Sequence, residues 1–126
     1  DFDFVVTARA ENLIRGVTDL DDTIRRLQAF EAVGADVLYA PGLKTVEEIR
    51  TVADAVGKPL NILMPPVRGA TLADVAAAGG KRLSVGAALY RAINAALVRA
   101  GSEMLEGGFN WMSDVTSNSD IKTLLS

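Results

Sequence analysis

The spacing of apolar residues along this chain follows two periods, that of a β-strand and that of an α-helix. Segments of the two kinds alternate along the sequence. Strand-type runs are expected at residues 2–8, 36–40, 59–63 and 82–85. Helical spacing of apolar residues follows each run, at residues 19–33, 45–56, 71–78 and 87–106, and a last short helix is expected at 119–125. Because helices separate successive strands, the pattern predicts right-handed βαβ crossovers and a parallel sheet.

Start and stop signals support these boundaries. Residues 45–48 form a capping box, in which a threonine hydroxyl accepts from a backbone N–H and a glutamate reaches back. Gly79 and Gly80 are expected to close the third helix, and Asn118 or Ser119 to cap the last one.

Residue parity within the strands distinguishes two kinds of parallel sheet. In the first strand, even positions form an apolar face and odd positions, ending at Arg9, form a mixed face. Asn61 opposes its apolar neighbours in the third strand, as Arg82 and Ser84 do in the fourth. An open doubly wound sheet needs two apolar faces because helices cover both. A barrel needs only one. The pattern therefore favours a (β/α)8 barrel.

Four βα units make half of such a barrel. The 126 residues fit one domain, and no linker divides them. The strand pattern starts within the first few residues and no Met precedes it, so we expect a fragment or a processed chain. Four parallel strands leave two open edges, which predicts either a missing partner half or pairing with another copy.

Composition excludes several classes of function. The net charge of -3 and the pI of about 4.9 argue against nucleic-acid binding. No apolar run approaches the ~18 residues of a membrane span, and no basic region opens a signal peptide. The chain has no Cys, which fits a cytoplasmic location. It has no His, so acid–base chemistry falls to Asp, Glu, Lys, Tyr or water.

Four segments carry a resemblance to a known family. They are FVVTARAEN at 4–12, AFEAVGADVLYAPGL at 29–43, KPLNIL at 58–63 and KRLSVGAALYRAINAAL at 81–97. In this order they resemble the isocitrate lyase/phosphoenolpyruvate mutase superfamily, above all its small bacterial members of the methylisocitrate lyase, phosphonomutase and oxaloacetate decarboxylase type. The resemblance implies that residues 1–126 are one domain, the C-terminal half of a TIM barrel: strands five to eight plus the C-terminal helices.

The resemblance also implies a reaction. Such enzymes are Mg2+-dependent lyases and mutases that make or break C–C or P–C bonds of small 2-oxo or 2-hydroxy acids through an enolate-like intermediate. Their metal ligands and gating loop lie in the N-terminal half, which is absent here. We therefore expect no metal ligand in this chain, activity in the complete protein, and none in this chain alone.

Arg9 and Glu11 are the first candidate site residues. A guanidinium at the C-terminal end of a barrel strand offers two parallel donors to a planar anion. The resemblance makes Arg9 a catalytic residue that holds a carboxylate or phosphonate; the alternative is a surface arginine paired with Glu11. Glu11 could orient Arg9 or hold a metal-bound water, or be a solvated loop residue. Asn12, next along the loop, reads as a turn former.

The other candidates follow the third and fourth strands. Asn61 is expected to bind substrate, with a satisfied core amide as the alternative. Ser84 and Gly86 precede a helix whose backbone N–H groups suit an anion, although Gly86 also suits a tight turn. Arg91, one turn into that helix, resembles an arginine of the lyases or forms a structural ion pair.

Residues 40–42 depart from the family, because methylisocitrate-lyase-like members carry a glutamate there. That favours a smaller acid as substrate. We expect a homo-oligomer, through the C-terminal helices around Trp111 or through open sheet edges. Two alternatives remain: an inactive half-barrel or structural module that self-associates, and a flavodoxin-like binding domain, which the single late glycine after the first strand disfavours.

Overall fold

The computed structural model describes residues 3–126, which form two compact units. The first unit ends at Gly86, and the second runs from Ala87 to Ser126.

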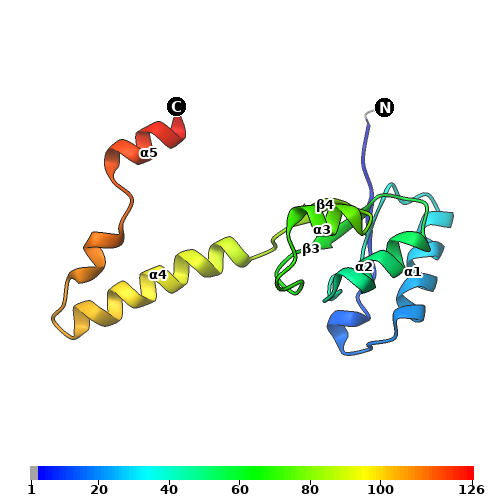
Figure 1. The fold of residues 1–126 in the computed structure, drawn as a ribbon, viewed down its shortest axis with the longest axis horizontal. Helices are drawn as coiled ribbons and strands as arrows, with labels where there is room; N and C mark the ends of the chain where they lie inside the picture. Colours follow the sequence, from blue (N-terminus) through cyan, green and yellow to red (C-terminus); the bar gives the residue numbers. More distant parts are fainter. Residues whose placement is uncertain (1–2) are drawn as a thin grey trace. The chain divides into compact units, whose positions relative to one another are not determined.

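The first unit is a four-stranded parallel sheet with helices between its strands (Figure 1). The strands lie in the order β1-β2-β3-β4, and their bounds are β1 Thr7–Arg9, β2 Val37–Tyr39, β3 Leu60–Leu63 and β4 Gly80–Ser84. The connecting helices are the 3-10 helix η1 Leu13–Arg15, α1 Leu20–Ala32, α2 Val46–Asp54 and α3 Leu72–Ala77. The predicted α/β fold with parallel βα units is confirmed.

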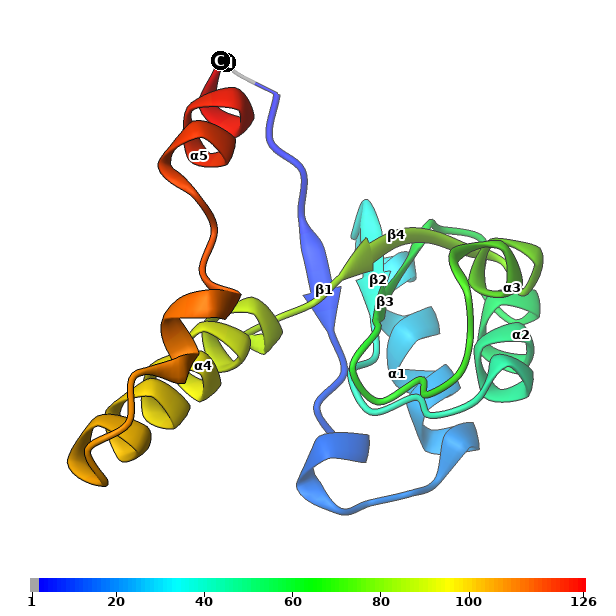
Figure 2. The ribbon, with the colours of Figure 1, turned by 60° about the vertical axis from the view of Figure 1, so that its left-hand side comes forward.

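All three α-helices of this unit pack on one face of the sheet (Figure 2). Apolar side chains from both layers meet there and are fully buried: Leu27, Leu38, Ile49, Val52, Leu60, Ile62 and Val75. Within the described part of the first unit, no helix covers the opposite face. One covered and one uncovered face is the arrangement of half a barrel, in which the uncovered face is the barrel interior.

Capping explains where the helices begin. The Thr45 hydroxyl accepts from the Glu48 N–H at 3.1 Å, and the Glu48 carboxylate accepts from the Thr45 N–H at 3.3 Å. The predicted capping box of α2 is therefore confirmed. α3 begins with the same device, made by Thr71 and Asp74, and the Asp19 carboxylate caps α1.

The first strand is shorter than predicted. We expected residues 2–8, of which Phe2 lies outside the described residues, but β1 begins only at Thr7. Val6 instead bonds to the residues at the start of β2: its N–H donates to the Asp36 carboxylate, and its carbonyl accepts from the Asp36 and Val37 N–H groups. β2 starts at Val37, which pairs with Thr7, so residues 4–6 precede the paired part of the two strands. Their side chains are exposed rather than on an apolar face.

A second correction concerns the end of α3. Gly80, expected to close this helix with Gly79, is the first residue of β4. Gly79 alone makes the left-handed turn, with φ of 96°. Gly80 is buried, and a Cβ there would lie 2.7 Å from a Val75 methyl carbon. It therefore allows the strand to start close to the helix.

The second unit consists of α4 Ala88–Leu105, the 3-10 helix η2 Asn110–Asp114 and α5 Asn118–Leu125. The Glu103 carboxylate accepts from the Asn110 and Trp111 N–H groups and so joins α4 to η2. Ser117 caps α5, not Asn118 or Ser119, because its hydroxyl accepts from the Asp120 N–H. Among residues 3–126, no helix has the length and apolar character needed to cross a membrane.

Candidate functional site

The strand register aligns four polar or aromatic residues across the sheet. Arg9 pairs with Tyr39, Tyr39 with Asn61, and Asn61 with Arg82. Their strand neighbours Ala8, Leu38, Ile62 and Leu83 belong to the core under the helices. Because successive side chains of a strand point to opposite faces, the four aligned residues lie on the uncovered face. We call these four residues the polar row.

Arg9 lies at the β1 end of the polar row, and two neighbouring residues hold it. Its Nε atom forms an ion pair with Glu11, and its guanidinium carbon lies 5.2 Å from the centre of the Tyr39 ring. Glu11 also pairs with Arg15, at 3.3 Å. Among residues 3–126, Arg9 forms no other ion pair. Its side chain is 46% exposed, so the two terminal nitrogens remain available to an anion.

Asn61 lies at the centre of a second group. Its Nδ2 donates to the Ser84 Oγ at 3.0 Å, and its Oδ1 accepts from Arg82 Nη1 at 3.4 Å. Ser84 in turn donates to the Ile62 carbonyl at 3.3 Å. Asn61 is only 1% exposed, although no helix of the first unit covers this face. The structure thus brings two predicted residues, Asn61 and Ser84, into contact, and the roles of both stay predictions.

Arg82 was not among the predicted site residues. The signal was present, because Arg82 shares the parity of Ser84 and therefore its face of the strand. What the sequence does not contain is the register that sets Arg82 level with Asn61. Gly86, with φ of 53°, is the last residue of the first unit, and Arg91 lies on α4 in the second unit. Their expected roles in anion binding also stay predictions.

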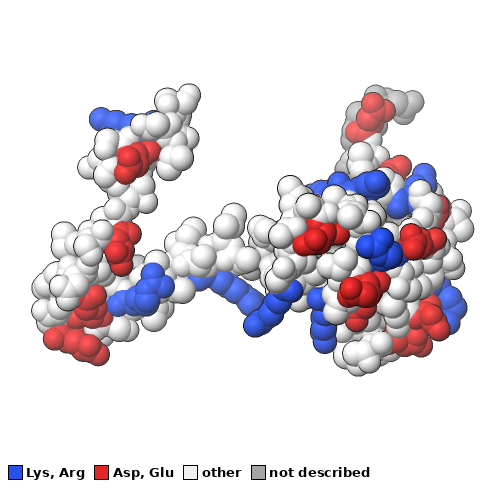
Figure 3. Space-filling model, viewed as in Figure 1, with Lys and Arg blue, Asp and Glu red and all other residues white. Residues whose placement is uncertain are grey.

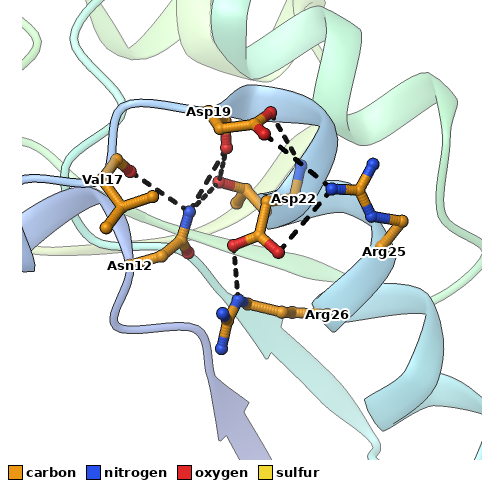
Figure 4. A network of polar contacts seen from close by, with 7 residues as sticks. Asn12, Val17, Asp19, Asp22, Arg25 and Arg26 are labelled. Carbon is orange, nitrogen blue, oxygen red and sulfur yellow. Dashed lines mark hydrogen bonds and ion pairs between the residues drawn. The ribbon is translucent and has the colours of Figure 1, made fainter.

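Asn12 anchors the loop that follows β1 (Figure 4). Its side chain is 5% exposed, and its Nδ2 donates to the Thr23 Oγ1 at 2.7 Å, with the Asp19 and Val17 carbonyls at 3.3 and 3.4 Å. The interpretation as a turn former was incomplete, because the amide also ties this loop to the first turn of α1. The loop that carries Glu11 is thus fixed to the helix layer.

The loop after β2 supports the same region from the other side. Ala40 and Pro41 are buried, and Gly42 has φ of 111°. A Cβ at Gly42 would lie 2.8 Å from the Cβ of Leu13 in η1, so the two loops are in close contact. Burial and the close contact between the two loops explain why residues 40–42 are small and apolar. None of the three carries an acidic side chain.

The charges of the described residues do not form a metal site. Within residues 3–126, no group of three or more Asp, Glu, His or Cys side chains could hold a metal ion. On the face drawn in Figure 3, acidic and basic side chains of the first unit are interspersed rather than gathered by sign. The described residues thus provide cationic and neutral hydrogen-bond donors, which suit an anion. They do not fit a Mg2+ site.

Known proteins resemble this chain along most of its length. The profile of the phosphoenolpyruvate phosphomutase family matches residues 1–105. An oxaloacetate decarboxylase of Rhodopseudomonas palustris (strain BisB5) is 35% identical over 92 residues, which are 72% of this chain and 32% of the relative. An oxaloacetate decarboxylase of Bradyrhizobium diazoefficiens is 50% identical over a shorter stretch of 44 residues, 35% of this chain and 15% of the relative.

Solved structures of other proteins also resemble this chain. A protein of Burkholderia cenocepacia J2315, assigned as a lyase/mutase, superposes with a TM-score of 0.88 at 45% identity, over 99% of this chain and 46% of that one. A phosphonopyruvate hydrolase, solved in complex with oxalate and Mg2+, gives a TM-score of 0.70 at 29% identity, over 97% of this chain and 45% of that one. The chain thus spans less than half the length of these solved relatives.

Proposed function

Because this chain belongs to the phosphoenolpyruvate phosphomutase family, we propose that it forms the anion-binding side of a lyase or mutase active site. The substrate is a small 2-oxo or 2-hydroxy acid, held by its carboxylate or phosphonate. The reaction makes or breaks a C–C or P–C bond beside that group, through an enolate-like intermediate. The relatives bound to oxalate or named for oxaloacetate decarboxylation support a small dicarboxylate as the substrate class.

One observation carries this proposal: Arg9 is held by two neighbours that leave its terminal nitrogens unpaired among the described residues. Glu11 binds its Nε and Tyr39 lies against its guanidinium, while the terminal nitrogens have no ion-pair partner in the described residues. A guanidinium held in this way is ready to bind a carboxylate through two parallel hydrogen bonds. It therefore loses little conformational entropy when the ligand binds.

The other candidate residues complete the same side of the site. Glu11 orients Arg9, while Asn61 of β3, Ser84 at the end of β4 and Gly86 after it supply neutral donors. For Arg91, which lies on α4 in the second unit, a role in substrate binding stays a prediction. Mg2+ is part of the proposal through the relatives, and its ligands are not among the described residues.

Replacement of Arg9 tests the proposal in the full-length protein. Charge-assisted hydrogen bonds contribute about 1.5–3 kcal/mol each, so Arg9→Ala should lower kcat/KM for oxaloacetate or phosphonopyruvate at least ~100-fold, with Mg2+ present. Arg9→Lys keeps the charge but not the planar pair of donors and should recover only part of the loss. Arg26→Ala removes an exposed arginine of α1 and serves as the control. Unchanged turnover in Arg9→Ala would refute the proposed role.

A second candidate function is a structural module that associates with another copy and does no chemistry. It is favoured by the apolar side chains that the second unit exposes, among them Leu89, Ile93, Leu97 and Leu124. Exposed apolar surface of this kind often marks an interface. Light scattering of the purified chain tests it: a dimer or larger species is expected, and a monomer that melts cooperatively would contradict it. A cytoplasmic location is part of either proposal.

A further inference from the structure

Arg82, Asn61 and Ser84 form a hydrogen-bonded chain on the uncovered face of the sheet. Arg82 and Asn61 are level in the strand register, while Ser84 pairs with Leu63, two residues further along β3. The chain of hydrogen bonds thus runs from the middle of the sheet toward the carboxyl ends of its strands. In barrels of this kind, that edge is where ligands bind.

The chemistry of Arg82 sets the direction of the Asn61 amide. A guanidinium has only donors, so the Asn61 atom that faces it, at 3.4 Å, must be the acceptor Oδ1. The Nδ2 group then points the other way and donates to the Ser84 Oγ at 3.0 Å. With the amide turned round, two donors would face each other at Arg82.

The direction of the amide in turn fixes the role of the Ser84 hydroxyl. A hydroxyl has one proton and two acceptor positions. Since Asn61 donates to Ser84, the hydroxyl is free to donate its own proton. It now donates to the Ile62 carbonyl at 3.3 Å, longer than the ~2.7–2.8 Å typical of an O–H···O hydrogen bond. Such a weak bond is readily exchanged for one to an anion.

Burial separates the two polar side chains. Asn61 is 1% exposed and has both ends of its amide engaged, whereas Ser84 is half-buried. A ligand arriving from solvent therefore reaches Ser84 before it reaches Asn61.

We infer that Arg82 is a positioning residue: it orients the Asn61 amide and thereby makes the Ser84 hydroxyl a hydrogen-bond donor to a substrate carboxylate at the C-terminal edge of the sheet. The inference rests on the proposed function, because it concerns the same anion site. It reassigns Asn61 from a direct ligand to a group that acts through Ser84.

Calorimetric titration of the full-length protein with oxalate, with Mg2+ present throughout, tests the inference. Arg82→Gln replaces a pure donor with a group that also accepts, so the amide can turn round. We expect its Kd to rise roughly tenfold, the effect of losing one hydrogen bond to a charged ligand. Arg82→Lys is again only a donor and should keep Kd within about threefold of the wild type. The control Arg26→Gln removes a charge on α1 and should stay within about twofold.

The double variant separates positioning from plain charge. If Arg82 acts through Ser84, Ser84→Ala alone should raise Kd roughly tenfold, and adding Arg82→Gln should raise it no further. If Arg82 acts only by its charge, the increases in Kd caused by the two substitutions multiply to roughly 100-fold. The increase caused by Arg82→Gln then becomes smaller in high salt. Multiplying effects, an Arg82→Gln variant that binds like the wild type, or a Lys variant as weak as the Gln variant would each overturn the inference.

Arg9→Ala distinguishes the failure of this inference from failure of the proposed function. Oxalate binding that survives Arg9→Ala unchanged would refute the anion site as a whole. Binding that is lost in Arg9→Ala but unchanged in Arg82→Gln would refute only the role of Arg82. Circular dichroism and the urea midpoint of each variant show that a change in Kd is not a loss of fold.

Discussion

Replacing Asn12 should destabilise the first unit, by an amount that its contacts define. The amide has two protons for three oxygens: Thr23 Oγ1 at 2.7 Å takes one, and the Asp19 and Val17 carbonyls at 3.3 and 3.4 Å share the other. Asn12→Ala leaves these oxygens short of a donor in a site that is 5% exposed. Leaving buried acceptors without a donor costs about 1–3 kcal/mol.

The middle of that range, about 2 kcal/mol, is the expected loss. Thr23 keeps its own bond to the Asp19 carbonyl at 2.9 Å, so the helix start is not lost altogether. The Asn12 Oδ1 is buried without a partner among the described residues, so its removal adds no cost. Urea unfolding followed by far-UV circular dichroism measures the change. Trp111 is the wrong probe, because it lies in the second unit.

Asn12→Asp gives a sharper test, because it keeps the shape and removes the donors. An ionised carboxylate there would face three oxygen atoms out of water, so its pKa in the folded state should lie above the ~3.9 of a free Asp. The raised pKa means that the added loss is absent below pH ~4 and grows as the pH rises toward the folded-state pKa. The deficit relative to Asn12→Ala should therefore be larger at pH 8 than at pH 5.

Two results would refute this account of Asn12. One is a loss below ~0.5 kcal/mol in Asn12→Ala, which is the size expected for an ordinary surface change. The other is a deficit of Asn12→Asp that does not change with pH. Asn94→Ala is the matched control, since Asn94 is an exposed amide that donates to the Tyr90 carbonyl within α4. It should change stability by no more than ~0.5 kcal/mol.

Three further predictions concern the elements around the site. Thr45→Ala removes the N-cap of α2 and should cost about 1 kcal/mol in urea unfolding, whereas Thr45→Ser should cost little. Gly42→Ala should cost over ~1 kcal/mol, because φ is 111° and the new Cβ meets Leu13; wild-type stability would show that the two loops move apart freely. Hydrogen bonds from the Thr71 side chain, then from its backbone, lower the pKa of Asp74 from 3.8 against a smaller desolvation effect. The stabilising effect of the ionised Asp74 carboxylate is thus complete above pH 3.8 and is lost as the pH falls toward the lowered pKa. Urea midpoints that fall equally in acid for the wild type and for Thr71→Val would contradict this.

Much of the fold was predictable, because the helix-facing side of each strand follows a simple rule. Burial on that side requires only an apolar side chain of suitable size, so period and parity identify it. The same rule misassigned residues 4–6, which alternate as a strand does. A strand also needs a neighbouring strand, and the pairing of β1 with β2 begins only at Thr7 and Val37. The sequence pattern records which side chains could be buried, not where the pairing of two strands begins.

The candidate site was less predictable for a related reason. Arg9, Asn61 and Ser84 could be named from parity and resemblance, but the contact between Asn61 and Ser84 appears only in the structure. Tyr39 and Arg82 could not be connected to them, because contacts across a sheet depend on register. No periodicity within one strand determines how far its neighbour is shifted. Asn12 was underestimated because two of its partners lie at the N-cap and in the first turns of a helix, seven and eleven residues away.

The register of β4 gives the clearest case of a feature that sequence patterns omit. Leu60 pairs with Gly80, but Asn61 pairs with Arg82, so the register shifts by one residue at Lys81. Without that shift Asn61 would pair with Lys81, and the strand would present the opposite set of side chains to the uncovered face, because a one-residue slip exchanges the two faces. Irregularities of this kind often occur beside functional sites, where they direct a side chain. The contacts of Asn61 with Arg82 and Ser84 therefore depend on a local departure from regular pairing, next to a glycine that has no room for a Cβ.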